Sequence, residues 1–224
     1  MYALNRLELR AEDLGPLRDF YTAILGLPLL SSTEEEVTFQ AGRSQLCFRR
    51  AEEAAPYHFA FNISPEKIES AADWLQGRAP LREADGRRIV EFANWNARAV
   101  YFTDPAGNIL EFIARHDLPF GDGGPFRPSD ILGLSEIGVV VEDVPTAVNQ
   151  IEGQLGMLPY KGSPSPDFAA LGDHDGLLIV VRKGRPWFST PSFPAESFPA
   201  KIEFEQGALG KLVLEGTNEI IVRP

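Results

Sequence analysis

The stretch "AEDLGPLRDFYTAILGLPL", residues 11–29, sets the architecture of the chain. Apolar residues between Leu14 and Ile24 recur at helical spacing, which predicts an amphipathic helix. Asp13 can cap the first turn of this helix, and Gly26 can end it. The sequence on either side alternates between apolar and polar residues instead, so we expect the helix to lie between strands.

A strand, this helix and three further strands form a unit that the sequence repeats. Module 1 spans residues 1–56, and module 2 spans residues 57–115 with a helix that Ser64 can cap. A third copy begins at "LSEIGVVVEDVPTAVNQIEGQLG", residues 134–156, with Asp143 at the cap position. A fourth copy begins at "AKIEFEQ", residues 200–206, but the few residues before Lys211 are too short for a helix.

The repeats predict an α+β protein with two β-rich halves, the second of which is truncated. Residues 1–115 form the first half and residues 134–224 the second. Between them, residues 116–133 read "HDLPFGDGGPFRPSDILG" and are rich in Gly and Pro without sustained periodicity. This segment is typical of a linker.

Composition restricts the function. The chain has 224 residues with 44% hydrophobic and 24% charged residues, and its formal net charge is -11. Such a charge argues against a nucleic-acid partner, because nucleic-acid affinity depends on clustered Lys and Arg. The single cysteine, Cys47, allows no intramolecular disulfide. Without a basic, apolar N-terminal leader or a run of roughly 20 apolar residues, we expect a cytoplasmic protein with a small-molecule ligand and no membrane partner.

One carboxylate in module 2 stands out in the strand "NILEFIAR", residues 108–115. Side chains alternate along a strand, so Glu111 shares a face with Ile109 and Ile113. Burying an ionised carboxylate without a partner costs several kcal/mol or shifts its pKa until the group is neutral. We therefore expect a metal, a cation, a hydrogen-bond donor or pocket water beside Glu111.

The phrases "AEDLGPLRDFYTAILGLPL" and "VYFTDPAGNILEF" together resemble the vicinal oxygen chelate superfamily. This superfamily includes glyoxalase I, fosfomycin and bleomycin resistance proteins and extradiol ring-cleaving dioxygenases. The resemblance covers residues 1–115 and, more faintly, 134–224. It implies paired βαβββ modules that form open barrels, with a divalent metal in the barrel mouth and ligands on the first and last strands of each module.

Carried onto this sequence, the ligand positions of the first half are Arg6, Cys47, His58 and Glu111. The resemblance implies His, His and Glu ligands, but Arg6 stands where the first His is usual, and a guanidinium offers no lone pair to a metal. Three alternatives follow. His58, Glu111 and Cys47 hold a soft metal such as zinc; Arg6 replaces the metal by pairing with Glu111; or Arg6 binds an anionic ligand.

Other candidate positions flank this set. Asn94, Trp95 and Asn96 precede the strand beside Glu111, where they can hydrogen-bond to a ligand and stack on it, or form an ordinary turn. The Pro- and Phe-rich connection 182–199 covers the first barrel or an oligomer interface, or packs on its own half. The corresponding ligand positions of the second half do not form a chelating set, so we expect any chemical site in residues 1–115. They are Glu136, Ile179, Lys201 and Ile221.

Two main functions fit the resemblance. The first is a small-molecule binding protein whose ligand lies in the barrel of the first domain, beside a partly degenerate metal site. The alternative is a divalent-metal-dependent enzyme, of lyase or ring-cleaving dioxygenase type, in which His58 and Glu111 hold Zn, Fe or Mn and Glu111 moves a proton. A metal-free site fits the sequence equally well. A third alternative is a scaffold whose pocket is vestigial, and a homodimer is among the assemblies that the sequence permits.

Overall fold

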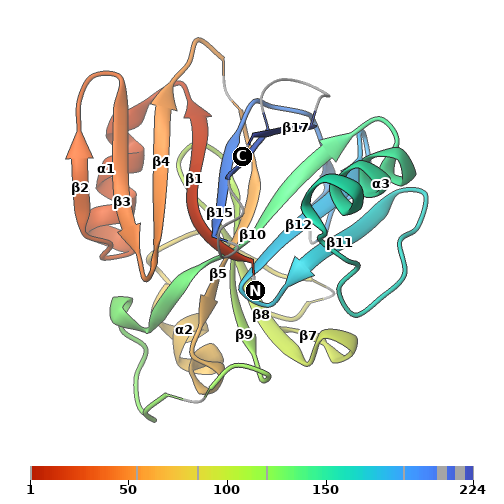
Figure 1. The fold of residues 1–224 in the computed structure, drawn as a ribbon. Coiled ribbons are helices and arrows are strands. Elements are labelled where there is room, and N and C mark those ends of the chain that lie inside the picture. The colour runs from red at the N-terminus through yellow and green to blue at the C-terminus, as the bar shows by residue number, and fades with distance from the viewer. Residues whose placement is uncertain are drawn as a thin grey trace.

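Among the described residues, the computed structural model contains two large β-sheets, each of which joins strands from both halves of the sequence, and two small two-stranded sheets (Figure 1). Parallel and antiparallel pairs occur in both large sheets, and helices are few. The predicted α+β class is therefore confirmed. The structure describes residues 2–53, 55–84, 86–119, 121–188, 190–205, 211–214 and 220–223.

Module 1 has the predicted order of a strand, a helix and three strands. As predicted, the Asp13 carboxylate caps the helix by accepting a hydrogen bond from the Gly15 N–H at 2.9 Å. The helical segment ends at Ile24, and Gly26 follows two residues later with a φ of 69°, in the left-handed region that favours glycine. The elements are β1 (Ala3–Ala11), α1 (Leu14–Asp19), the π-helix η1 (Phe20–Ile24), β2 (Leu29–Ser32), β3 (Glu36–Ala41) and β4 (Ser44–Arg50).

Module 2 follows the same plan with one extra short strand. Ser64 precedes the helical segment but makes no side-chain capping bond, so the predicted cap is not formed. The short strands β6 and β7 both pair with β8. The elements are β5 (His58–Ile63), η2 (Pro65–Lys67), α2 (Ile68–Leu75), β6 (Leu81–Arg82), β7 (Val90–Phe92), η3 (Ala93–Trp95), β8 (Ala97–Thr103) and β9 (Ile109–Arg115).

Module 3 repeats the capped helix, since the Asp143 carboxylate accepts a hydrogen bond from the Thr146 N–H at 2.7 Å. Its first strand begins at Ile131, inside the predicted linker. The expected lack of a helix before Lys211 falls on residues 206–210, which lie outside the described residues. The elements after module 2 are η4 (Pro128–Asp130), β10 (Ile131–Val141), α3 (Val144–Leu155), β11 (Phe168–Asp173), β12 (Gly176–Arg182), β13 (Pro186–Trp187), β14 (Thr190–Pro194), β15 (Lys201–Glu205), β16 (Lys211–Leu214) and β17 (Ile220–Arg223).

The partners of the modules differ from the expected ones. One sheet has the order β15-β1-β4-β3-β2, and the larger has the order β11-β12-β10-β5-β9-β8-β6. Module 1 therefore shares a sheet with module 4, and module 2 shares a sheet with module 3, whereas the sequence suggested that modules 1 and 2 pair. Backbone pairs β1–β15 and β5–β10 thus cross the expected boundary at residues 116–133.

The two sheets pack on one continuous apolar core. Buried side chains of both sheets, from Leu4 in β1 to Phe204 in β15, belong to one large cluster. A second, smaller cluster contains Tyr101 and Trp187. A buried hydrogen bond of 2.8 Å joins the Tyr21 hydroxyl of module 1 to the Asp104 carboxylate in the turn of module 2. Among the described residues, no helix is long and apolar enough to cross a membrane.

Gly42 lies where module 1 packs closely on β10. Gly42 follows the end of β3, and its φ is 56°. A Cβ on Gly42 would lie 2.2 Å from the Leu132 carbonyl. The backbone N–H of Arg43 donates to the same carbonyl at 3.0 Å. A side chain at residue 42 would therefore separate the two sheets.

We expect Gly42→Ala to lower the free energy of unfolding by more than about 3 kcal/mol, because backbone strain adds to overpacking. Gly77→Ala is the matched control: its φ is 77°, but nothing lies within 4 Å of the added Cβ. Strain alone should cost about 1 kcal/mol there. Urea unfolding measures both values, and equal losses would contradict the observed contact between module 1 and β10.

Candidate metal centre and ligand cavity

His58 begins β5, a central strand that pairs with both β9 and β10. Its Nδ1 lies 3.1 Å from the carbonyl oxygen of Ile109. Because a carbonyl only accepts, Nδ1 carries the proton and Nε2 keeps a free lone pair. Burial lowers the pKa of His58 to about 4, against a smaller opposing effect of the Ile109 hydrogen bond. The imidazole is therefore neutral at neutral pH.

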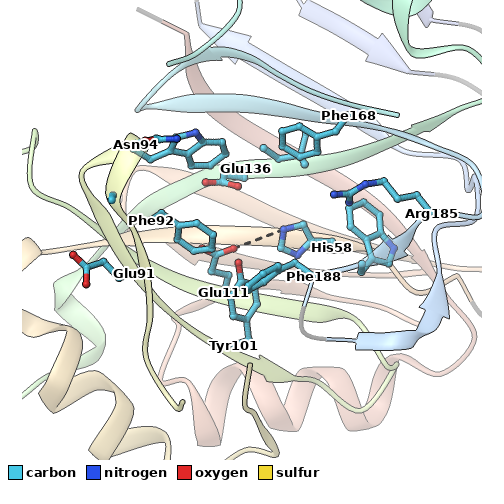
Figure 2. Close-up of a pocket in the computed structure, with 14 residues that line it drawn as sticks. His58, Glu91, Phe92, Asn94, Tyr101, Glu111, Glu136, Phe168, Arg185 and Phe188 are labelled. Atoms are coloured by element: carbon cyan, nitrogen blue, oxygen red, sulfur yellow. Dashed lines mark ion pairs between the residues drawn. The ribbon is translucent and has the colours of Figure 1, made fainter. Parts of the chain in front are cut away.

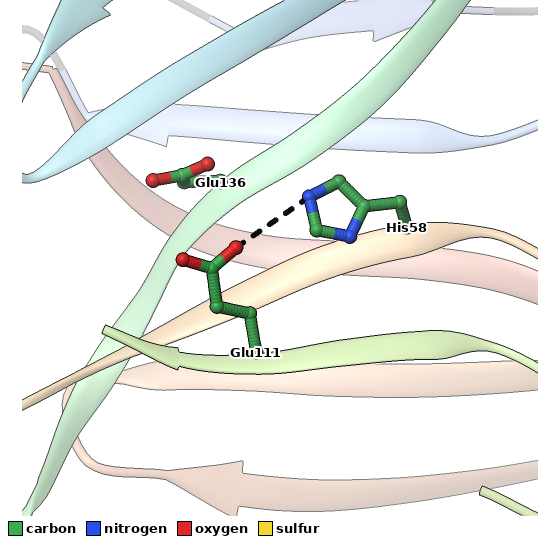
Figure 3. Close-up of side chains that lie close together, drawn as sticks. All are labelled: His58, Glu111 and Glu136. Atoms are coloured by element: carbon green, nitrogen blue, oxygen red, sulfur yellow. Dashed lines mark ion pairs between the residues drawn. The ribbon is translucent and has the colours of Figure 1, made fainter. Parts of the chain in front are cut away.

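Glu111 meets His58 because β5 and β9 run in parallel. In their register Ala60 lies beside Glu111, and His58 shares the face of Ala60 two residues earlier. The Glu111 Oε2 atom lies 3.7 Å from His58 Nε2 (Figure 3). Burial and the neighbouring Glu136 charge raise the pKa of Glu111 well above its usual value, while a hydrogen bond from Tyr101 and the Arg115 charge oppose the shift.

Glu136 reaches the same place from the other side of β5. It lies opposite Ala60 in the antiparallel β5–β10 pair, so the small Ala60 separates two glutamates on the strands that flank β5. Neighbouring strands are about 4.8 Å apart, which lets both carboxylates meet above the alanine. Figure 3 shows Glu111 and Glu136 converging with the His58 ring. The three candidate donor atoms all lie within 4.8 Å of one another.

Arg115 supplies the positive charge behind this cluster. Its fully buried guanidinium pairs with Glu136, and its Nε donates to Asn62 Oδ1 at 3.2 Å. The guanidinium also lies over the rings of Trp95 and Tyr160, at 5.6 and 5.5 Å. Burial raises the pKa of Glu136, and the Arg115 charge counteracts it. Two carboxylates and one guanidinium leave a single net negative charge when both glutamates are ionised.

The donor set fits a divalent metal ion. One neutral imidazole and two carboxylates are suitable ligands for Zn²⁺, Fe²⁺ or Mn²⁺. The donor atoms lie within 4.8 Å of one another, near the separation of at most about 4.4 Å between two atoms that share one metal ion. A second protein group orients each donor, as metal ligands require: the Ile109 carbonyl, the Tyr101 hydroxyl and Arg115.

The three donors open onto a cavity of about 470 Å³ (Figure 2). Six of the 14 lining residues are Phe, Tyr or Trp. One of them is Trp187, whose ring centroid lies 5.2 Å from that of His58. Gly138 makes room for this indole, because a Cβ there would lie 2.5 Å from Trp187 Cη2. The lining residues are His58, Glu91, Phe92, Ala93, Asn94, Trp95, Tyr101, Glu111, Glu136, Phe168, Ile179, Arg185, Trp187 and Phe188.

Two of the three residues in the predicted Asn94–Trp95–Asn96 group lie at the cavity, and the third does not. Asn94 and Trp95 line the cavity. Asn96 is not among its lining residues; it ends η3 in the left-handed conformation, and its Nδ2 donates to Asp117 Oδ1 at 2.8 Å. This bond fixes the turn that carries Trp95.

Arg6 and Cys47 lie on the other sheet, so the structure does not bring them together with Glu111. The Arg6 Nη1 donates to Gln45 Oε1 at 2.9 Å, and its Nη2 lies 3.7 Å from Glu8. Burial raises the pKa of the Cys47 thiol, which favours its uncharged form. The suggested ion pair between Arg6 and Glu111 is replaced by the contacts of Glu111 with His58 and Tyr101.

Sequence reasoning missed Glu136. It occupies the first strand of module 3 at the position that His58 occupies in module 2, so the signal was present in the repeat. The sequence did not indicate a role for it, because the corresponding positions of the second half do not form a chelating set. The structure instead combines module 2 with module 3, so the candidate site lies across the expected boundary between the halves.

His58 predicts a specific pH dependence of stability. The unfolded pKa is 6.5 and the folded pKa about 4, so the unfolded chain binds the extra proton between these values, and stability falls as the pH drops through this window. Relative to His58→Gln, the metal-free wild type should lose up to about 3 kcal/mol of its free energy of unfolding as the pH falls from about 7 to about 4.

Denaturant unfolding of both proteins across this range measures the effect. The raised pKa of Glu111 acts in the opposite sense, because it makes the folded state lose stability as the pH rises. That contribution is present in both proteins and cancels in the difference. Parallel pH profiles for wild type and His58→Gln would contradict a neutral, buried imidazole.

Solved structures share the fold of this chain. A putative dioxygenase from Bacillus subtilis subsp. subtilis str. 168 has 17% sequence identity and a TM-score of 0.60, with 80% of this chain and 63% of that chain covered. Glyoxalase I from Zea mays has 16% identity and a TM-score of 0.56, with 91% of this chain and 75% of that chain covered. No curated protein sequence matches the chain significantly.

A family-level match covers residues 3–112, which span modules 1 and 2. It agrees with the resemblance carried by the helix phrase in module 1 and the final strands of module 2. Residues 3–112 thus match the model of the Glyoxalase/Bleomycin resistance protein/Dioxygenase superfamily.

Proposed function

We propose that the chain is a metal-dependent enzyme that binds a small molecule in the cavity between modules 2 and 3. The convergence of His58, Glu111 and Glu136 supports this function best. A bound divalent ion would act as a Lewis acid that polarises two neighbouring oxygens of the ligand. The side chains around the ion would carry out the remaining steps, such as proton transfer.

The two glutamates have different surroundings, which assigns them different roles. Arg115 holds Glu136 by a permanent charge and favours its ionised form, as suits a fixed metal ligand. Glu111 is hydrogen-bonded to the neutral hydroxyl of Tyr101 and faces the cavity. We assign to Glu111 the transfer of a proton from the ligand, in a lyase-type or isomerase-type reaction.

The aromatic residues of the cavity wall favour a reaction from which water is excluded. Tyr101 and Trp187 are buried, and the rings of Phe92 and Phe188 lie 5.6 Å apart at its edge. In such surroundings the charges of Glu111 and Glu136 interact more strongly with a ligand than they would in water. Both halves of the chain supply this wall, so the proposed ligand site is not confined to residues 1–115.

A second candidate is sequestration of an apolar molecule without turnover. The aromatic lining favours it, because stacking and burial of apolar surface give affinity without a reaction. The two candidates differ in the need for a metal, and the same measurement separates them.

Protein purified without chelator should contain one equivalent of a divalent metal per chain by elemental analysis. His58→Ala and Glu136→Gln should each weaken metal affinity by more than about 100-fold, since loss of a ligand exceeds the effect of losing a group that only orients one. Calorimetric titration of the chelator-treated protein with Zn²⁺, Mn²⁺ and Fe²⁺ measures this affinity.

Two variants serve as matched controls. Glu91→Gln changes an exposed glutamate at the cavity that is outside the donor cluster, and Cys47→Ser changes the thiol on the other sheet. Both should keep wild-type metal affinity. If the wild type binds none of the three ions, the metal-dependent function is wrong and sequestration becomes the better account.

A further inference from the structure

Arg185 brings a positive charge into the cavity without a visible acidic partner. It precedes β13 and is partly exposed. Its Nη1 makes a long contact of 3.4 Å to the Pro186 carbonyl, and its guanidinium lies 5.2 Å from the centroid of the Phe168 ring. Within the described part of the chain, no carboxylate forms an ion pair with Arg185, whereas Arg115 behind the cavity is paired with Glu136.

The position of Arg185 sets it apart from the donor cluster. Figure 2 shows its side chain entering on the His58 side of the cavity, while Asn94 lies on the opposite side. It is the one Lys or Arg among the lining residues, in a chain whose formal net charge is -11. Arg185 is therefore the lining side chain whose charge would attract an anionic ligand.

The rest of the wall favours a flat ligand. Neighbouring rings lie within stacking distance: Tyr101 and Phe188 at 5.7 Å, and Phe92 and Trp95 at 6.0 Å. Faces and edges of such rings pack well on another aromatic ring. The volume of about 470 Å³ lies in the usual range for small-molecule sites.

We infer that the cavity takes an aromatic carboxylate, whose carboxylate group binds the Arg185 guanidinium while its ring lies between the aromatic side chains. This inference rests on the proposed function in one respect, namely that the ligand oxygens face His58, Glu111 and Glu136. A single guanidinium matches the two oxygens and one charge of a carboxylate. Arg185 is thus a specificity-determining residue for the charged end of the ligand.

Two probes of nearly equal shape test this assignment. 3,4-Dihydroxybenzoate and 3,4-dihydroxybenzamide carry the same pair of neighbouring hydroxyls but differ in charge. Calorimetry with the Zn²⁺-loaded protein should show about tenfold tighter binding of the benzoate, the lower range for a hydrogen bond to a charged group. Arg185→Gln should abolish this preference and leave the affinity for the benzamide within about twofold of wild type.

Arg182→Gln is the matched control, because Arg182 is an exposed arginine at the end of β12 and is not a lining residue. It should retain the full preference for the benzoate. A preference that persists in Arg185→Gln, an equal loss of both probes in that variant, or no binding of the benzoate to the wild type would each overturn the inference.

Removing the metal separates this inference from the proposed function. Chelator treatment should weaken both probes to the same extent and leave their ratio unchanged. If chelation has no effect while the ratio still depends on Arg185, the metal-dependent function fails and the carboxylate site stands. If chelation weakens the binding of both probes but Arg185→Gln leaves their ratio unchanged, the carboxylate site is wrong and the metal-dependent function stands.

Discussion

Two carboxylates buried on either side of Ala60 impose the constraint on which the candidate site depends. At about 4 Å in surroundings of intermediate dielectric, two like charges repel by about 4 kcal/mol. Arg115 compensates for Glu136 with a charge-assisted bond, and the Tyr101 hydroxyl contacts Glu111. The remaining negative charge faces an aromatic cavity, and a divalent cation is the kind of group that would neutralise it there.

The same guanidinium connects this charge balance to the cavity wall. Arg115 lies over the rings of Trp95 and Tyr160. Contacts with Asp117 and Lys161 fix the turn that carries Trp95. The group that orients Glu136 therefore also supports a ring that a ligand would touch. On the other side, Trp187 packs against His58 in the space that Gly138 leaves. Donors and wall are thus one packed unit in which side-chain positions depend on each other.

Local features were predictable where a short stretch contains all the interacting groups. Asp13 and Asp143 cap their helices through N–H groups two or three residues away, and Gly26 follows the end of a helical segment with a left-handed φ that suits glycine. The alternation around Glu111 also identified a carboxylate that needs a partner. The identity of that partner was not predictable, because it depends on strands distant in sequence. Arg6 was the suggested neighbour, and the structure places Glu136 there instead.

The sequence by itself determined the strand and helix order of the modules, the superfamily resemblance and the unusual character of Glu111, since each is encoded by spacing within a few dozen residues. Only the tertiary structure decided that β5 pairs with β10 and β1 with β15. The hydrogen bonds between strands join backbone groups that all residues except proline share, so alternation shows which side chains share a face but not which strand lies beside it. That choice follows from how the apolar faces of all four modules are buried in one core, and it brings Glu136 to His58 and Glu111.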